Sequence, residues 1–186
     1  MRYNVLIKRI EKVINRHKLL EALNRAFDET VYSEYRQRMA ACLLDKDGNI
    51  LAVGHNTKES YFWMKQKNGY RRDQKGSHCE LDAVRNYVAE VINSKTVVQL
   101  DIAGIGAMFT NKMMNPTESQ EKYFFEFVRS LKIPMIVVAR RKGGILSDTR
   151  GSSKPCKGCW EFLRRCGIKS VVYYDEDNHF IEETIN

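Results

Sequence analysis

Two short segments that carry histidine and cysteine, far apart in the chain, constrain its fold more than any other feature. His78-Cys79-Glu80 begins one stretch with the apolar spacing of a helix, and Pro155-Cys156-Lys157-Gly158-Cys159 begins another. Cysteines three positions apart place both sulfurs on one side of a helix start, where unpaired backbone amides and the helix dipole favour the thiolate. With the His78 imidazole they supply three ligands for one metal ion, provided that the fold brings the two helix starts together.

Chain length and composition predict a single domain. The sequence has 186 residues, of which 43% are hydrophobic and 29% charged, enough for one sizeable core. Its longest apolar run, residues 102–109, is far shorter than the roughly 20 residues that a membrane-spanning helix needs. No apolar block typical of a signal peptide follows Met1. We therefore expect one cytoplasmic domain over residues 1–186, without membrane contact.

The five cysteines are not expected to form a disulfide framework, because their number is odd and no export signal is visible. Cys156 and Cys159 form the Cys-x-x-Cys pair described above. The three single cysteines, Cys42, Cys79 and Cys166, are expected to be small buried hydrophobic side chains.

Apolar spacing and turn residues predict an α/β order of elements. Apolar residues at steps of three and four between residues 4 and 27 predict an N-terminal amphipathic helix with His17 on its apolar stripe. Asp47-Gly48 predicts a hairpin between two apolar runs. Further helices are expected from Ser77 to Val91, from Pro116 to Leu131 with Asn115 as cap, and from Pro155 to Cys166. Further strands are expected at residues 100–108, 134–139, 168–174 and, closing the sheet as an antiparallel strand, 180–185.

The three ligands and Glu80 indicate hydrolytic chemistry. Three protein ligands and one open position are the arrangement of catalytic zinc, whereas structural zinc is closed by a fourth ligand. Zinc in an open site can lower the pKa of bound water to about 7. Glu80 lies at the same helix start as His78, so its carboxylate can take a proton from that water and deliver it to a substrate nitrogen.

A closed structural zinc site is the alternative interpretation of the same residues. His55, Cys166 or His179 would then supply the fourth ligand, and the ion would only stabilise the fold. Cys79 is a further candidate ligand, although it points about 100 degrees around the helix from His78 and suits packing better. A structural zinc does not require a carboxylate beside its histidine, which favours the catalytic interpretation.

The two segments together resemble the His-x-Glu and Pro-Cys-x-x-Cys signature of the zinc-dependent cytidine and deoxycytidylate deaminase superfamily. The likeness covers roughly residues 39–174 and includes the order of elements. It implies a three-layer cytidine-deaminase-like α/β fold, in which helices flank a mixed sheet of about five strands, and Zn²⁺ as cofactor. Because Cys156 follows His78 by 78 positions, more than is usual in the family, residues of about 94–132 are expected as an insertion. Residues of about 1–37 are expected as a helical extension.

The resemblance also implies substrate contacts. Asn56, at the end of the second predicted strand, matches the family position whose asparagine bonds the sugar. Lys154 stands where the family more often has a polar or acidic side chain that touches the base, so Ser153 or Ser152 is expected to make that contact. The implied reaction is hydrolytic removal of an exocyclic amine, with cytosine as the expected base.

The net charge of +8 is concentrated next to the metal motif. Residues 57–77 hold six basic and two acidic side chains, and residues 139–154 hold five basic and one acidic, so these two segments account for the whole excess. A basic excess favours partners that carry phosphate. The residues expected to hold the phosphate of a nucleotide are Arg140, Arg141, Lys142, Arg150 and Lys154.

We therefore predict a deaminase that acts on cytosine in a free nucleotide such as dCMP or CMP, in a chain that forms homo-oligomers. Aromatic residues interleaved with the basic ones of 57–77 suit base stacking, so the second hypothesis is deamination of cytosine or adenine in single-stranded DNA or RNA. A non-enzymatic, zinc-stabilised module that binds nucleic acid is the third.

Overall fold

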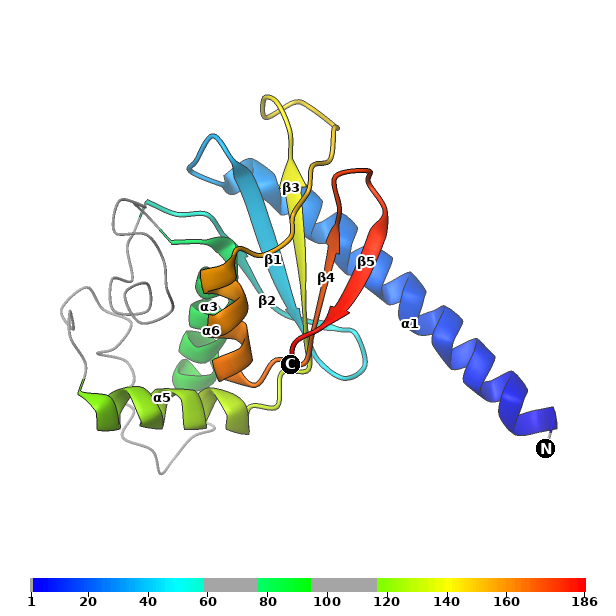
Figure 1. Cartoon of the computed structure of the whole chain (residues 1–186), viewed down its shortest axis with the longest axis horizontal. Coiled ribbons are helices and arrows are strands. Elements are labelled where there is room, and N and C mark those ends of the chain that lie inside the picture. Colours follow the sequence, from blue (N-terminus) through cyan, green and yellow to red (C-terminus); the bar gives the residue numbers. More distant parts are fainter. Residues whose placement is uncertain (1, 59–76, 95–116) are drawn as a thin grey trace.

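The described strands form one five-stranded mixed sheet in the order β2-β1-β3-β4-β5. The computed structural model describes residues 2–58, 77–94 and 117–186 (Figure 1). The strands are β1 (Arg38–Leu44), β2 (Ile50–His55), β3 (Met135–Arg141), β4 (Ser170–Tyr174) and β5 (Phe180–Thr184). The described helices are α1 (Arg2–Glu29), the 3-10 helix η1 (Thr30–Tyr32), α3 (Cys79–Asn93), α5 (Glu118–Ser130) and α6 (Lys157–Cys166).

Helices cover both faces of the sheet, which confirms the predicted three-layer α/β fold (Figure 1). Side chains alternate between the two faces of a strand, so neighbouring residues of β3 belong to different cores. Val137 belongs to the buried cluster that includes Leu23 of α1, whereas Val138 belongs to the cluster that includes Phe124 of α5 and Phe162 of α6. Helix α3 contributes to the same cluster as α5 and α6.

Both predicted hairpins form. β1 and β2 pair antiparallel around a turn in which Gly48 has a φ of 80°. β4 and β5 pair antiparallel from Ser170 opposite Thr184 to Tyr174 opposite Phe180, which confirms the predicted direction of the closing strand. β3 and β4 run parallel, so the chain crosses between them through α6.

Helix α3 begins one residue later than predicted. His78, not Ser77, occupies its N-cap position. Ser77 instead exchanges two backbone hydrogen bonds with Thr57, at 2.8 and 3.0 Å. This bridge fixes the chain immediately before the histidine.

Helix α5 also begins later than predicted. Thr117 caps it, because the Thr117 hydroxyl accepts from the Gln120 amide and the Gln120 side chain accepts from the Thr117 amide. The prediction of Asn115 as cap and Pro116 as first helical residue was therefore wrong. The strand predicted at residues 100–108 lies outside the described residues.

The buried face of α1 differs from the predicted stripe. The His17 side chain is 73% exposed and lies 3.5 Å from Glu21, so its placement on the apolar stripe was wrong. Within residues 16–29 of this helix, the part whose side chains are described, the buried residues are Leu19, Ala22, Leu23, Ala26 and Phe27. Although α1 has 28 residues, no helix in the described part of the chain is apolar enough to span a membrane.

Helix α3 lies directly against β2 at Gly54. A Cβ atom at Gly54 would lie 2.1 Å from the backbone nitrogen of Ala83 and 2.4 Å from the carbonyl oxygen of Cys79. Both are backbone atoms of α3, so no side-chain rotation can make room. Gly54 therefore sets how closely α3, with His78 at its start, packs on the sheet.

We expect Gly54→Ala to lower the free energy of unfolding by about 1–3 kcal/mol, the usual cost of overpacking. The melting temperature should fall by about 2–4 °C for each kcal/mol. Gly144→Ala is the matched control, because nothing lies within 4 Å of its Cβ position. Thermal unfolding of both variants checks this, and a Gly54→Ala protein as stable as wild type would contradict the close packing.

Candidate metal centre

The structure brings the three predicted metal ligands together. The Nδ1 atom of His78 lies 3.5 Å from Sγ of Cys156 and 3.4 Å from Sγ of Cys159. All three ligand atoms lie within 4.8 Å of one another. Tetrahedral zinc, with Zn–S of about 2.3 Å and Zn–N of about 2.0–2.1 Å, needs nitrogen and sulfur ligands about 3.6 Å apart. The cluster could therefore hold a metal ion, and its donors and spacing fit zinc.

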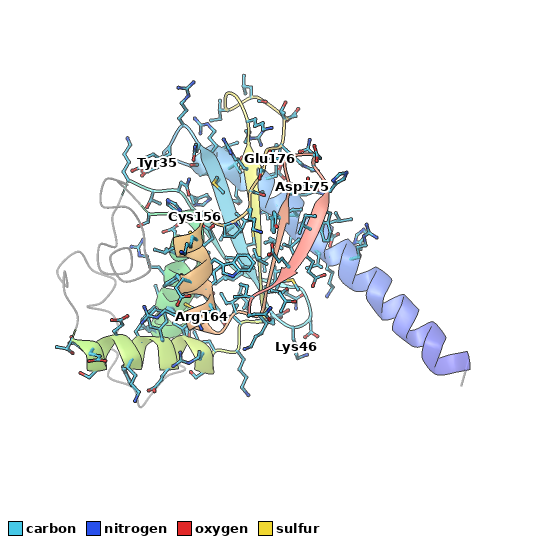
Figure 2. All side chains as sticks on the ribbon, viewed as in Figure 1. Tyr35, Lys46, Cys156, Arg164, Asp175 and Glu176 are labelled. Carbon is cyan, nitrogen blue, oxygen red and sulfur yellow. The ribbon has the colours of Figure 1, made fainter. Side chains whose placement is uncertain are left out.

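The ligands sit at two helix starts. Cys156 occupies the N-cap position of α6, and its Sγ accepts from the Cys159 amide at 3.5 Å. His78 occupies the N-cap position of α3. Cys159 is fully buried, whereas Cys156 is exposed at the N-terminal start of α6 (Figure 2). The cluster thus reaches from the core to the surface at Cys156.

The pKa of the thiol distinguishes Cys156, a predicted metal ligand, from the packed cysteines. The pKa of its thiol is lowered from 9.0 to about 4, chiefly by hydrogen bonding with the Cys159 side chain and further by His78, while burial opposes the shift. A low pKa favours the thiolate, the form that binds metals. Burial instead raises the pKa of Cys42 to about 12. Cys42, Cys79 and Cys166 are all buried, as predicted.

Among the described residues, no fourth histidine, cysteine or carboxylate joins the cluster. The Nε2 atom of His55 lies 3.0 Å from Glu29. His179 lies in the β4–β5 turn beside Asp175. Cys166 ends α6, about 10 Å along the helix axis from Cys159. None of the three alternative fourth ligands closes the site in this arrangement.

Glu80 lies in the first turn of α3 and is only 1% exposed. The Cys79 thiol donates to Oε2 of Glu80 over 3.3 Å. Burial raises the pKa of Cys79 well above 9.0, so this thiol keeps its proton at neutral pH. Cys79 is thus a packed neighbour that orients the Glu80 carboxylate.

Asn56, predicted to contact a substrate sugar, is engaged in the fold. Its Nδ2 donates to the carbonyl of Gln37 at 3.0 Å, and its Oδ1 accepts from the Cys79 amide at 2.9 Å. The first amides of a helix have no partner within the helix, and Asn56 satisfies one of them. This role in positioning α3 was missed by sequence analysis, because 23 positions separate the two residues.

Asp82 provides a second link between β2 and α3 that sequence analysis missed. Its Oδ2 accepts from the His55 amide at 2.9 Å and from Asn86 at 3.3 Å, and Asn86 also donates to the Val53 carbonyl at 2.8 Å. Burial raises the pKa of Asp82, while the hydrogen bond from the His55 amide opposes the shift. These contacts hold α3 on the sheet next to His78.

Ser153, predicted to contact the base, is fully buried. Its hydroxyl donates to the Val138 carbonyl at 2.8 Å and accepts from the Tyr174 amide at 3.2 Å. Its own amide donates to the Tyr174 carbonyl at 2.9 Å. Ser153 therefore holds the segment before Cys156 against the middle of β3 and the carboxyl end of β4.

Three of the five predicted phosphate-binding residues make contacts within the fold. Arg141 is buried and donates to the Thr30 hydroxyl at 2.9 Å and to the Phe27 carbonyl at 3.2 Å. Arg150 donates to the Tyr174 hydroxyl at 2.8 Å and to Asn24 at 2.7 Å. Lys154 lies 2.9 Å from Glu183 and over the rings of Trp160 and Tyr173. The remaining two, Arg140 and Lys142, line an open pocket.

In comparisons with known proteins, no family model and no curated protein matches this chain. The three-layer fold and the ligand cluster are compatible with the cytidine-deaminase-like superfamily that the motifs resemble.

We expect His78→Ala to abolish stoichiometric zinc binding and to lower the melting temperature, because one of three ligands is lost and metal binding stabilises the folded state. His179→Ala is the matched control: His179 forms a second, surface cluster with Asp175 and Asp177. Zinc content after gel filtration measures the result. Retention of one zinc ion in His78→Ala, or its loss in His179→Ala, would place the metal elsewhere.

Proposed function

We propose that this protein is a zinc-dependent hydrolase that deaminates cytosine in a free nucleotide, producing uracil and ammonia. The observation that carries the proposal is the convergence of His78, Cys156 and Cys159 at the helix start that also bears the buried Glu80. A structural metal site does not need this carboxylate. The resemblance of the two motifs to the deaminase signature supplies the reaction class.

The metal would be held by the imidazole and the two thiolates. When bound, zinc supplies Lewis acidity that lowers the pKa of a water to about 7. The protein contributes the orientation of the ligands: Asn56 and Asp82 fix α3, and Ser153 fixes the segment that leads into α6.

Glu80 would carry the protons of the reaction. Its carboxylate accepts a proton from the attacking water and passes it to the ring nitrogen. The proton of the hydroxyl group added to the ring carbon then passes to the exocyclic amine, which leaves as ammonia. In the balanced reaction, a carbon–oxygen bond forms, a carbon–nitrogen bond breaks, and one water is consumed. Burial and the Cys79 thiol hold the carboxylate in one orientation throughout.

Deamination within a single-stranded nucleic acid is the second candidate. Five basic side chains line one open pocket, more than a single phosphate requires. A zinc-stabilised nucleic-acid-binding module without activity is the third, and it predicts salt-sensitive binding with no ammonia release.

We expect Glu80→Gln to retain zinc but to lose at least about a hundredfold in rate, because the amide cannot accept and return a proton. Glu90→Gln, an exposed change near the other end of α3, is the matched control and should leave the rate unchanged. Rates are measured as ammonia release together with zinc content. A Glu80→Gln enzyme with wild-type rate would rule out the shuttle.

The substrate is tested by incubating the zinc-loaded protein with cytidine, dCMP, dCTP and a cytosine-containing single strand. We expect the loss of cytosine to be fastest with dCMP. Conversion of the strand alone would replace the lead proposal by the second candidate, and conversion of none of them would favour the third.

A further inference from the structure

An open cavity of about 730 Å³ lies between the segment that enters β1 and the segment that leaves β3. Five of its eight lining residues are basic and none is acidic: Arg36, Arg38, Arg140, Arg141 and Lys142, with Gln37, Gly143 and Gly144. Such a concentration of one charge in a concave surface attracts anions. We call this cavity the basic pocket.

Two of the five cations are parts of the scaffold. One nitrogen of the Arg38 guanidinium, Nη1, donates to the carbonyls of Val31 and Ser33 at 3.1 and 3.2 Å. Arg141 bonds Thr30 and Phe27, as described above. These arginines anchor the chain between α1 and β1. The Arg141 guanidinium also lies 3.5 Å from the Asp148 carboxylate, so Arg38 contributes more of its charge to the pocket than Arg141 does.

The other three cations are available to a ligand. Among the described residues, no carboxylate lies within ion-pair distance of Arg36, Arg140 or Lys142. The Nε atom of Arg140 is buried and has no hydrogen-bond partner in this part of the chain. A buried donor without a partner is unfavourable, so the fold does not hold this guanidinium by the kind of hydrogen bonds that fix Arg38 and Arg141. Gly151 packs against the Arg140 and Lys142 side chains and leaves them on a common side.

The basic pocket lies at the same edge of the sheet as the metal ligands. Its lining residue Gln37 accepts a hydrogen bond from Asn56, which in turn binds the first amide of α3 next to His78. Figure 2 shows Tyr35 and Cys156 toward one end of the sheet and Lys46 at the opposite end. A substrate at the metal centre can therefore extend toward the pocket.

We propose that the basic pocket binds phosphate groups of the substrate through Arg36, Arg140 and Lys142. Arginine and lysine are the side chains that bind phosphate by charge-assisted hydrogen bonds. The cavity volume falls in the range of sites that hold whole small-molecule ligands, so it has room for more than one phosphate. Its role as a substrate clamp rests on the proposed deaminase function, whereas phosphate binding itself does not. The phosphates are those of a nucleotide or of a single strand.

The test uses the double variant Arg36→Gln/Lys142→Gln in the full chain. Both side chains are exposed, so the fold should be retained, which melting temperature and zinc content verify. The matched control is Lys46→Gln/Lys169→Gln, which removes the same charge from exposed positions away from the pocket. The probes are a fluorescent oligo-dT, which contains no cytosine to react, and dCMP.

We expect the pocket variant to bind oligo-dT or dCMP on the order of tenfold more weakly than the control at low salt. If the strand is the source of the phosphates, the slope of log K against log salt should also fall by about 1.4, at about 0.7 for each phosphate contact of a single strand. Weaker binding of dCMP alone would identify a nucleotide phosphate, and weaker binding of oligo-dT would identify a strand.

Equal affinities of the pocket variant and the control for both probes would overturn the proposal, whether or not the protein is a deaminase. Weaker binding in a protein that deaminates no substrate would support the pocket and reject the proposed function. The two proposals therefore fail separately.

Discussion

The hydrogen bonds of the Asn56 side chain are the interaction on which the geometry of the metal centre depends. They join the entry to β1, the exit of β2 and the first amide of α3, where His78 lies. Gly54, two residues earlier, lets the helix backbone approach the strand without a side chain between them. The position of the histidine is thus fixed by these contacts with the sheet and by the Thr57–Ser77 bridge immediately before it.

A corresponding arrangement fixes the cysteines. Ser153 is bonded to both β3 and β4, and Cys156 and Cys159 follow it at the start of α6. Because β3 and β4 are parallel neighbours, the helix between them starts at the edge where β3 ends. The two helix starts meet at one sheet edge, where hydrogen bonds with the Cys159 side chain, His78 and the Cys159 amide favour the Cys156 thiolate.

At this edge of the sheet, some basic side chains form hydrogen bonds within the fold and others are exposed to solvent. Arg38 and Arg141 use their guanidinium groups on backbone carbonyls and hydroxyls of the fold. Arg36 and Lys142 leave their charge at the surface. Basic residues close together in sequence therefore have different roles. In β3, alternation turns the neighbouring Arg140 and Arg141 to opposite faces, whereas Arg36 lies before β1 begins at Arg38.

Local patterns were sufficient to predict much of the fold. Asp47-Gly48 predicted the first hairpin, and Gly167, with a φ of 78°, ends α6 as expected. The three candidate metal ligands were predicted because two cysteines three positions apart, and a histidine at a second helix start, are residue types and spacings typical of zinc sites. Long-range partners were not predictable: no local signal pairs Asn56 with Cys79, or Ser153 with Tyr174. The wrong placement of His17 on the buried side of α1 has the same cause, a dependence on long-range contacts. Which side of α1 is buried depends on the strands against which the helix packs.

X-ray absorption at the zinc edge of the metal-loaded protein tests the central claim most directly. The account predicts one zinc ion per chain with two sulfur ligands at about 2.3 Å and two nitrogen or oxygen ligands at about 2.0–2.1 Å. These would be Cys156, Cys159, His78 and one exchangeable water. A shell of three or four sulfurs, or the absence of tightly bound zinc, would contradict it.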